Sequence, residues 1–186
     1  MNIAVFCGSS GGHNPLYAKE AHAFGKILAK GGHGLVYGGG RVGLMGAVAD
    51  GVLEGKGHVM GVIPHSLEQK ELAHTGVSEL HIVNNMHERK AMMAARADAF
   101  VALPGGVGTL EEIFEAWTWA QLGYHQKPIA FLDFGGFYTH LFSFLNHMKE
   151  EGFLQSIHRE MLISETDPHI LLEKLKAYTP PRNKWE

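Results

Sequence analysis

Short, continuous apolar runs alternate with longer segments of helical periodicity along almost the whole chain. Such runs, bounded by glycine or proline, are typical of buried strands, whereas apolar positions three or four residues apart are typical of helices. The pattern predicts strands at 3–7, 35–37, 59–63, 80–83, 99–103, 128–132 and 161–163. It predicts helices at 14–30, 43–54, 86–97, 113–122, 138–151 and 167–178, with a polar connection of helical character at 66–74.

This order predicts a single α/β domain over residues 1–178, followed by a C-terminal tail at 179–186. Apolar runs without polar alternation indicate strands that are buried on both faces, which is typical of a parallel sheet. We therefore expect a doubly wound, Rossmann-like domain with a mainly parallel sheet of about seven strands and helices on both faces. Glycine clusters beginning at Gly8, Gly38 and Gly105 follow three of the strands, so these loops are expected to share one cleft.

The segment 104–112, Pro-Gly-Gly-Val-Gly-Thr-Leu-Glu-Glu, has the pattern of a glycine-rich turn between a strand and a helix. A helix N-terminus presents backbone N–H groups that favour an anion such as phosphate. We expect Thr109 to be the N-cap, with Glu112 completing a capping box. Two glutamates, Glu111 and Glu112, are unusual at a phosphate site and suggest chemistry on the rest of the ligand, although one of them is expected to serve only the helix dipole.

Arginine and methionine share one face of the predicted helix at 86–97. Arg96 is expected to extend from a half-buried position to solvent. Arg89 lies in the first turn, near a strand end, and its planar fork can clamp a phosphate or hydroxyl groups or orient a carboxylate. We therefore expect Arg89 to be a functional residue.

The helix after the glycine-rich turn carries a core stripe, and one aromatic side chain lies off it. Trp119 is predicted to pack in a subunit interface, because aromatic residues are enriched there. The stripe itself consists of Leu110, Ile113, Phe114, Trp117 and Ala120.

Composition and charge exclude several classes of function. The formal net charge of -3 gives no basic surface for nucleic acid. Cys7 is the only cysteine and is expected to be a small buried residue in a cytoplasmic protein. No run is long enough to span a membrane, and no signal peptide is apparent. The thirteen histidines lack the spacing of metal ligands, so no metal is expected.

The spacing Gly38-x-Gly40-x-x-Gly43 matches a dinucleotide-binding fingerprint formally. It follows the second strand rather than the first, and the acidic residue expected about 20 residues later is missing. An NAD-dependent oxidoreductase is therefore a weak alternative.

Two motifs of this chain resemble those of the Lonely Guy family, the cytokinin riboside 5′-monophosphate phosphoribohydrolases. Residues 104–112 are similar to the family motif PGGxGTxxE, and residues 86–90, Met-His-Glu-Arg-Lys, to its second motif. Residues 6–10, 37–40 and 115–123 extend the resemblance, which covers the chain to about residue 178. Such proteins were formerly labelled lysine decarboxylases, but the sequence shows no recognisable pyridoxal-phosphate site.

The resemblance implies hydrolysis of the N-glycosidic bond of adenosine 5′-monophosphate or an N6-substituted analogue, without a cofactor and within a homodimer. Position by position, it implies Arg89 and Glu112 as the catalytic pair. It implies substrate binding by Glu71, Lys90, Gly105, Gly106, Val107, Gly108, Thr109 and Glu111, with the glycines and Thr109 on the phosphate. A non-catalytic carrier of nucleotide or molybdenum cofactor, from a family with the same fold, is the alternative.

Overall fold

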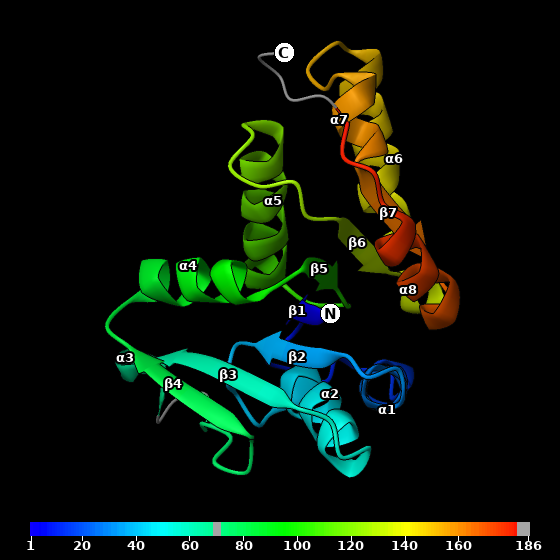
Figure 1. The fold of residues 1–186 in the computed structure, drawn as a ribbon. Coiled ribbons are helices and arrows are strands. Elements are labelled where there is room, and N and C mark those ends of the chain that lie inside the picture. The colour runs from blue at the N-terminus through cyan, green and yellow to red at the C-terminus, as the bar shows by residue number, and fades with distance from the viewer. Residues whose placement is uncertain (69–71, 182–186) are drawn as a thin grey trace.

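The computed structural model describes residues 1–68 and 72–181, and its centre is a parallel sheet of seven strands (Figure 1). The strand order is β4-β3-β2-β1-β5-β6-β7, and every neighbouring pair is parallel. This confirms the predicted sheet. The strands are β1 (Asn2–Phe6), β2 (Gly34–Tyr37), β3 (Val59–Pro64), β4 (Glu79–Val83), β5 (Ala99–Ala102), β6 (Ile129–Leu132) and β7 (Leu162–Glu165).

Helices connect the strands and cover both faces of the sheet, as the sequence predicts. In Figure 1, α2 and α4 lie on opposite sides of β2 and β3. The helices are α1 (Leu16–Lys30), α2 (Gly43–Glu54), α3 (His65–Glu68), α4 (Met86–Arg96), α5 (Val107–Gln121), η1 (Phe134–Gly136), α6 (Thr139–Glu150), α7 (Ser156–Glu160) and α8 (Pro168–Ala177).

Successive residues of each strand feed two separate cores. Ile3 and Val5 of β1 pack with α1, α2 and α8, whereas Ala4 and Phe6 pack with α4, α5 and α6. Side chains of a strand alternate between the two faces of the sheet, so one continuous apolar run supplies both cores. This explains why the strands lack polar alternation.

The helices α1 and α2 pack against each other with little space between their backbones. A Cβ added to Gly25 would lie 2.3 Å from the carbonyl oxygen of Val48, and one added to Gly51 would lie 2.1 Å from that of His22. Only glycine permits this approach of the two backbones. The two helices therefore pack with their backbones in close contact.

Four local features differ from the sequence prediction. The helix α5 begins at Val107, so Gly106 is its N-cap and the prediction of Thr109 is wrong. The polar connection predicted at 66–74 contains only the short α3 among its described residues, and η1 and α7 were not predicted.

Among the described residues, no helix is long and apolar enough to cross a membrane. The predicted tail at 179–186 lies largely outside the described residues.

Candidate active site

Three glycine-rich loops meet at the carboxyl ends of β1, β2 and β5. The strands β1 and β5 are neighbours at the point where the strand order reverses, which is where doubly wound folds bind ligands. The N–H of Gly8 donates to the carbonyl oxygen of Pro104 at 3.1 Å, and the carbonyl oxygen of Gly8 accepts from Leu44 N–H at 2.9 Å. The expectation of one shared cleft is confirmed for the Gly8 and Gly105 loops, which line the same cavities, whereas the glycines of the Gly38 loop line neither cavity.

The start of α5 is open towards this cleft. Gly106 has an extended conformation, and no described side chain caps the helix. A Cβ added at Gly106 or Gly108 would meet no atom within 4 Å, so space for a ligand adjoins the backbone there. The first N–H groups of a helix lack partners within it and favour an anion. The start of α5 therefore has the geometry of a phosphate site.

Thr109 occupies the third position of this helix rather than its cap. Its side chain is buried, and a Cβ added to Gly105 would lie 2.1 Å from Thr109 Oγ1. Thr109 thus packs under Gly105 and requires glycine at that position. Because the N-cap lies three residues earlier than predicted, Glu112 is not placed to complete a capping box with Thr109.

The start of α2, by contrast, is already occupied by protein. The N–H groups of Leu44 and Met45 both point at the carbonyl oxygen of Gly8, at 2.9 Å and 3.4 Å. A Cβ added to Gly43 would lie 2.3 Å from the backbone of Ser9. The glycines of this fingerprint-like segment therefore serve packing of the loops, and the segment does not form a dinucleotide site.

One cavity of about 390 Å³ brings the predicted catalytic residues together. Arg89 from α4 and Glu112 from α5 both line it, as do the first residues of α5 from Gly106 to Thr109. The other residues that line it are Cys7, Gly8, Ser9, Met45, Leu67, Met86 and Glu111. A cation, a carboxylate and an anion-binding helix start thus face one space, which suits a ligand with a phosphate and a second reactive centre.

Arg89 is 5% exposed, and a backbone carbonyl of the Gly38 loop fixes its guanidinium. Nη2 donates to the carbonyl oxygen of Gly38 at 2.9 Å, and a Cβ on Gly38 would lie only 1.9 Å from Nη2. The first glycine of the Gly38 loop is therefore needed to admit the arginine. This role could not be inferred from the local sequence.

A capping arrangement fixes the start of α4, on which Arg89 lies. The side chain of Asn85 accepts from Glu88 N–H at 2.9 Å, and the Glu88 carboxylate accepts from Asn84 N–H at 2.9 Å. These hydrogen bonds from Asn84 and Asn85 hold the pKa of Glu88 below its usual value. This cap was not predicted from the sequence, although Asn followed three residues later by Glu is a usable signal.

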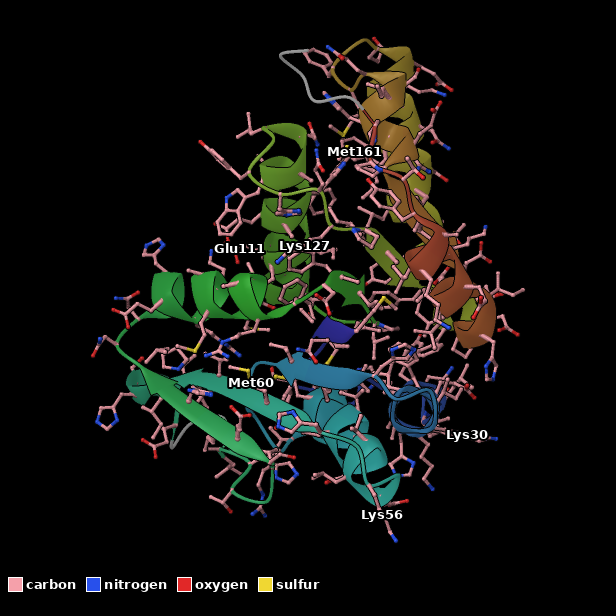
Figure 2. The ribbon with its side chains drawn as sticks, in the orientation of Figure 1. Lys30, Lys56, Met60, Glu111, Lys127 and Met161 are labelled. Carbon is pink, nitrogen blue, oxygen red and sulfur yellow. The ribbon has the colours of Figure 1, made fainter. Side chains whose placement is uncertain are left out.

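Lys90 forms ion pairs with two carboxylates of α5. Its Nζ lies 2.5 Å from Glu111 and 3.1 Å from Glu115. Figure 2 shows Glu111 where α4 and α5 meet. Burial alone would lower the pKa of Lys90, but the hydrogen bonds to Glu111 and Glu115 raise it above its usual value. Glu71, the remaining predicted ligand, lies outside the described residues.

Two further buried residues, Cys7 and Tyr138, lie next to the ends of β1 and β5. Cys7 is buried, as predicted, and burial together with the Glu112 carboxylate raises its pKa, so the thiol stays protonated. Tyr138, which was not predicted as a site residue, donates from its hydroxyl to the carbonyl oxygen of Leu103 at 2.6 Å and so anchors the end of β5. Nothing in the sequence around Tyr138 signals this contact.

The described histidines, cysteine, aspartates and glutamates form no group of three or more that suits a metal ion. Nucleophile activation through Cys7 is equally unfavourable, because a protonated buried thiol is a poor nucleophile. The chemistry of the cavity therefore centres on Arg89, Glu112 and the start of α5.

Sequence comparisons point to one group of proteins. The family described as "Possible lysine decarboxylase" matches residues 45–175, which is more than half of the chain. A probable cytokinin riboside 5′-monophosphate phosphoribohydrolase of Oryza sativa subsp. japonica is 47% identical, over 98% of this chain and 75% of that protein. A cytokinin riboside 5′-monophosphate phosphoribohydrolase of Arabidopsis thaliana is 46% identical, over 96% of this chain and 82% of that protein.

Solved structures with the same fold include proteins of a different kind. The molybdenum cofactor binding protein of Rippkaea orientalis has a TM-score of 0.70 and 22% identity, with 95% of each chain covered. The molybdenum cofactor carrier protein of Chlamydomonas reinhardtii has a TM-score of 0.71 and 19% identity, with 95% of this chain and 98% of that chain covered. At these identities the likeness shows the fold alone.

Proposed function

This chain belongs to the family of cytokinin riboside 5′-monophosphate phosphoribohydrolases, and from that premise we propose which of its residues act on the nucleotide. The protein is a nucleotide N-glycosyl hydrolase that cleaves adenosine 5′-monophosphates of the cytokinin type into free base and ribose 5-phosphate. One observation carries the proposal for the site: Arg89, Glu112 and the open start of α5 line the same cavity.

The 5′-phosphate binds at the start of α5 in this proposal. Gly105, Gly106, Val107, Gly108 and Thr109 supply the backbone and the hydroxyl around it. The absence of side chains at Gly106 and Gly108 leaves the approach to the backbone open. Binding at the phosphate provides energy at a distance from the bond that breaks, which favours monophosphates over nucleosides.

Glu112 acts on the sugar–base bond. Cleavage of a glycosidic bond passes through a transition state with positive charge on the sugar. A carboxylate in this position stabilises that charge and activates the attacking water. Glu112 lies one helical turn beyond the phosphate-binding residues, so a bound nucleotide can reach both.

Arg89 is the partner that the geometry gives to Glu112. Its guanidinium is buried and is held in place by the carbonyl of Gly38, so little freedom is lost when it contacts the substrate. We assign it the orientation of the carboxylate and of the sugar hydroxyl groups.

Lys90, Glu111 and Glu71 were predicted to contact the nucleotide, and this assignment stays a prediction. The ion pair between Lys90 and Glu111 supports an indirect role for Lys90, because its ammonium group neutralises a carboxylate near the phosphate. Glu111 lines the cavity and is therefore still placed for direct contact.

A homodimer is proposed from an apolar hollow of about 490 Å³ on α4, α5 and the loop after α5. Trp119, Tyr124 and His125 line it, and Tyr124 is 76% exposed. The same two helices carry Arg89 and Glu112, so a partner seated here lies near the site.

The cytoplasmic location predicted from the lone Cys7 also stays a prediction.

Release of free base tests the function. The protein is incubated with adenosine 5′-monophosphate and with its N6-prenyl analogue, and chromatography measures the base and ribose 5-phosphate. We expect both products in equal amounts and no release from the corresponding nucleosides. A protein that is inert towards a broad panel of nucleoside monophosphates, yet binds molybdopterin stoichiometrically, contradicts the proposal and favours a carrier.

A further inference from the structure

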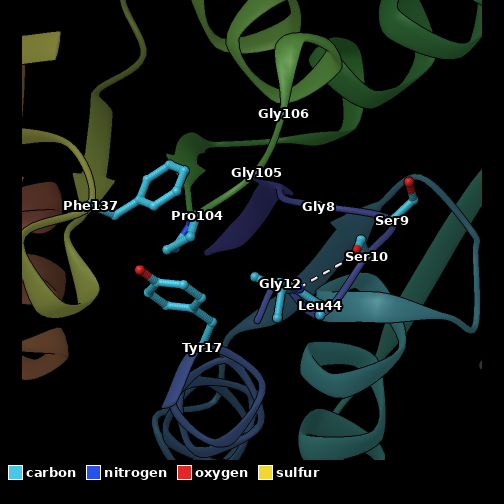
Figure 3. Close-up of a pocket in the computed structure, with 11 residues that line it drawn as sticks. Gly8, Ser9, Ser10, Gly12, Tyr17, Leu44, Pro104, Gly105, Gly106 and Phe137 are labelled. Atoms are coloured by element: carbon cyan, nitrogen blue, oxygen red, sulfur yellow. Dashed lines mark hydrogen bonds between the residues drawn. The ribbon is translucent and has the colours of Figure 1, made fainter. Parts of the chain in front are cut away.

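A second cavity, of about 300 Å³, lies beside the catalytic cavity along the same edge of the sheet (Figure 3). The loop after β1, the first turn of α1 and the loop after β5 form its walls, and Phe137 closes one end. Gly105 and Gly106 of the proposed phosphate site line it, but neither Arg89 nor Glu112 does. The rest of this cavity has no role in the function assigned so far.

The order of the two cavities follows from the residues that they share. Gly8, Ser9 and Gly106 line both, whereas Arg89 and Glu112 line only the catalytic cavity. Gly106 also belongs to the proposed phosphate site. A phosphate at the start of α5 thus lies between the two cavities, with its sugar on one side and the second cavity on the other.

The chemistry of the second cavity favours an apolar ring over a second phosphate. Its walls include Tyr17, Leu44, Pro104 and Phe137, and no lysine or arginine is among the described residues that line it. A further phosphate would be bound best by a cation, which none of these residues supplies. Figure 3 shows Tyr17, Pro104 and Phe137 together at one end and Ser9 and Ser10 at the other.

Contacts within the protein hold the aromatic side chains at one end of this cavity in place. The rings of Tyr17 and Phe137 pack edge to face, with centroids 5.7 Å apart and an angle of 79° between their planes. Tyr138, the neighbour of Phe137, is anchored by hydrogen bonds to Leu103 and Asp133. An incoming ring would meet pre-ordered aromatic surfaces, which lowers the cost of binding.

We propose that this second cavity accepts an aromatic group esterified to the 5′-phosphate, so that the protein binds aromatic adenosine 5′-phosphodiesters as well as monophosphates. The inference rests on the proposed function for the position of the phosphate. The esterified group extends from the phosphorus on the side away from the sugar. The second cavity lies on that side. The ligand class comprises dinucleotides and aryl esters of adenylate.

Competition against cleavage of adenosine 5′-monophosphate tests the inference. The probes are adenosine 5′-phenyl phosphate and adenosine 5′-methyl phosphate, which carry the same charge and differ only in the ring. We expect the phenyl ester to bind about tenfold more tightly than the methyl ester. Adenosine 5′-diphosphate, which places charge in the apolar cavity, should bind more weakly than the phenyl ester.

A variant locates the effect. Phe137→Ala should bring the ratio between the two esters close to one, whereas Phe153→Ala, which removes a ring that is 85% exposed on the loop after α6, should keep the ratio. Equal affinities of the two esters for the unaltered protein would overturn the inference, even if base release from the monophosphate is normal. If no base is released, the proposed function fails, and calorimetry with the two esters still decides the inference.

Discussion

The ammonium group of Lys90 lies 2.5 Å from the carboxylate of Glu111, so an ion pair joins α4 to α5 beside the proposed phosphate site. Lys90 also contacts Glu115 at 3.1 Å, and its side chain is only 11% exposed. Lys90 thus offsets the charge of Glu111, which lines the cavity, and of Glu115 on the same helix. An anion binds there more readily when that offset is intact.

Replacing Lys90 tests this role. Lys90→Met leaves Glu111 and Glu115 without their cation, and their charge then repels the phosphate. We expect KM for adenosine 5′-monophosphate to rise about tenfold, with a smaller change in kcat. The double variant Lys90→Met with Glu111→Gln should recover part of the loss. Steady-state kinetics at low salt measures both.

A distant ion pair provides the control. Lys176→Met breaks a contact of 2.9 Å with Glu173 on α8, far from the site, and should leave KM unchanged. If the Lys90 variant loses kcat at constant KM, Lys90 does not act on phosphate binding.

Glu112→Gln keeps the size of the side chain and removes its charge. The charge on the sugar in the transition state then has no counterpart, so we expect base release to fall about 10²- to 10⁴-fold. Binding of the nucleotide, measured by calorimetry, should change little, because the phosphate site is intact. Glu150→Gln, on the exposed end of α6, is the matched control. Lost binding with normal turnover of bound substrate would contradict the role assigned to Glu112.

The fold was predictable because its determinants are local. Apolar runs, glycine clusters and helical spacing follow directly from the sequence, and the start of α5 was misplaced by only a few residues because Gly106 caps it without a side chain. A strong N-cap residue, Thr109, drew the prediction to the wrong position.

The contacts that arrange the site were not predictable in the same way. Arg89 meets Gly38 across 51 residues of chain, and Tyr138 meets Leu103 across 35. Neither contact leaves a periodic or compositional signal. The sequence indicated that Arg89 and Gly38 lie near one cleft, but only the tertiary structure shows that one depends on the other.

Gly38→Ala tests that dependence without removing any functional group. The added Cβ would lie 1.9 Å from Arg89 Nη2 and must displace the guanidinium. We expect kcat to fall about a hundredfold, since a shift of about 1 Å in a positioning group has an effect of that size. Gly76→Ala, whose Cβ would meet only a histidine side chain, is the control. Normal activity of Gly38→Ala would show that the position of Arg89 is not critical.

The apolar hollow around Trp119 predicts self-association. We expect the protein to sediment as a dimer at micromolar concentration and Trp119→Asp to sediment as a monomer, because a buried charge without a partner opposes association. Phe153→Asp, at an exposed aromatic residue elsewhere, should stay dimeric. A monomeric unaltered protein would contradict the interface.

His125 makes stability depend on pH. Its Nε2 donates to the carbonyl oxygen of Ala116 at 2.9 Å, and its Nδ1 accepts from Lys127 N–H at 3.2 Å, so both ring nitrogens are satisfied only in the neutral form. Burial, with the nearby Lys127 charge, lowers its pKa below the ordinary 6.5. Between about pH 6.5 and the lowered pKa, His125 is therefore protonated in the unfolded chain and neutral in the folded protein. This contribution to stability is complete above pH 6.5 and is lost as the pH falls through the lowered pKa.

The substitution His125→Gln isolates this contribution, because glutamine can also donate and accept but does not titrate. Urea unfolding at pH 7.5 and pH 5.5 should show a smaller loss of the free energy of unfolding in the variant than in the unaltered protein. His33, whose pKa is also lowered by burial, continues to titrate in both, so the difference between the two proteins belongs to His125. His140→Gln, which makes the same chemical change at an exposed position on α6, controls for the substitution itself. Equal losses in the His125 variant and the unaltered protein would show that the folded protein accepts the charged ring, and that the hydrogen bond from Lys127 to Nδ1 does not hold His125 neutral.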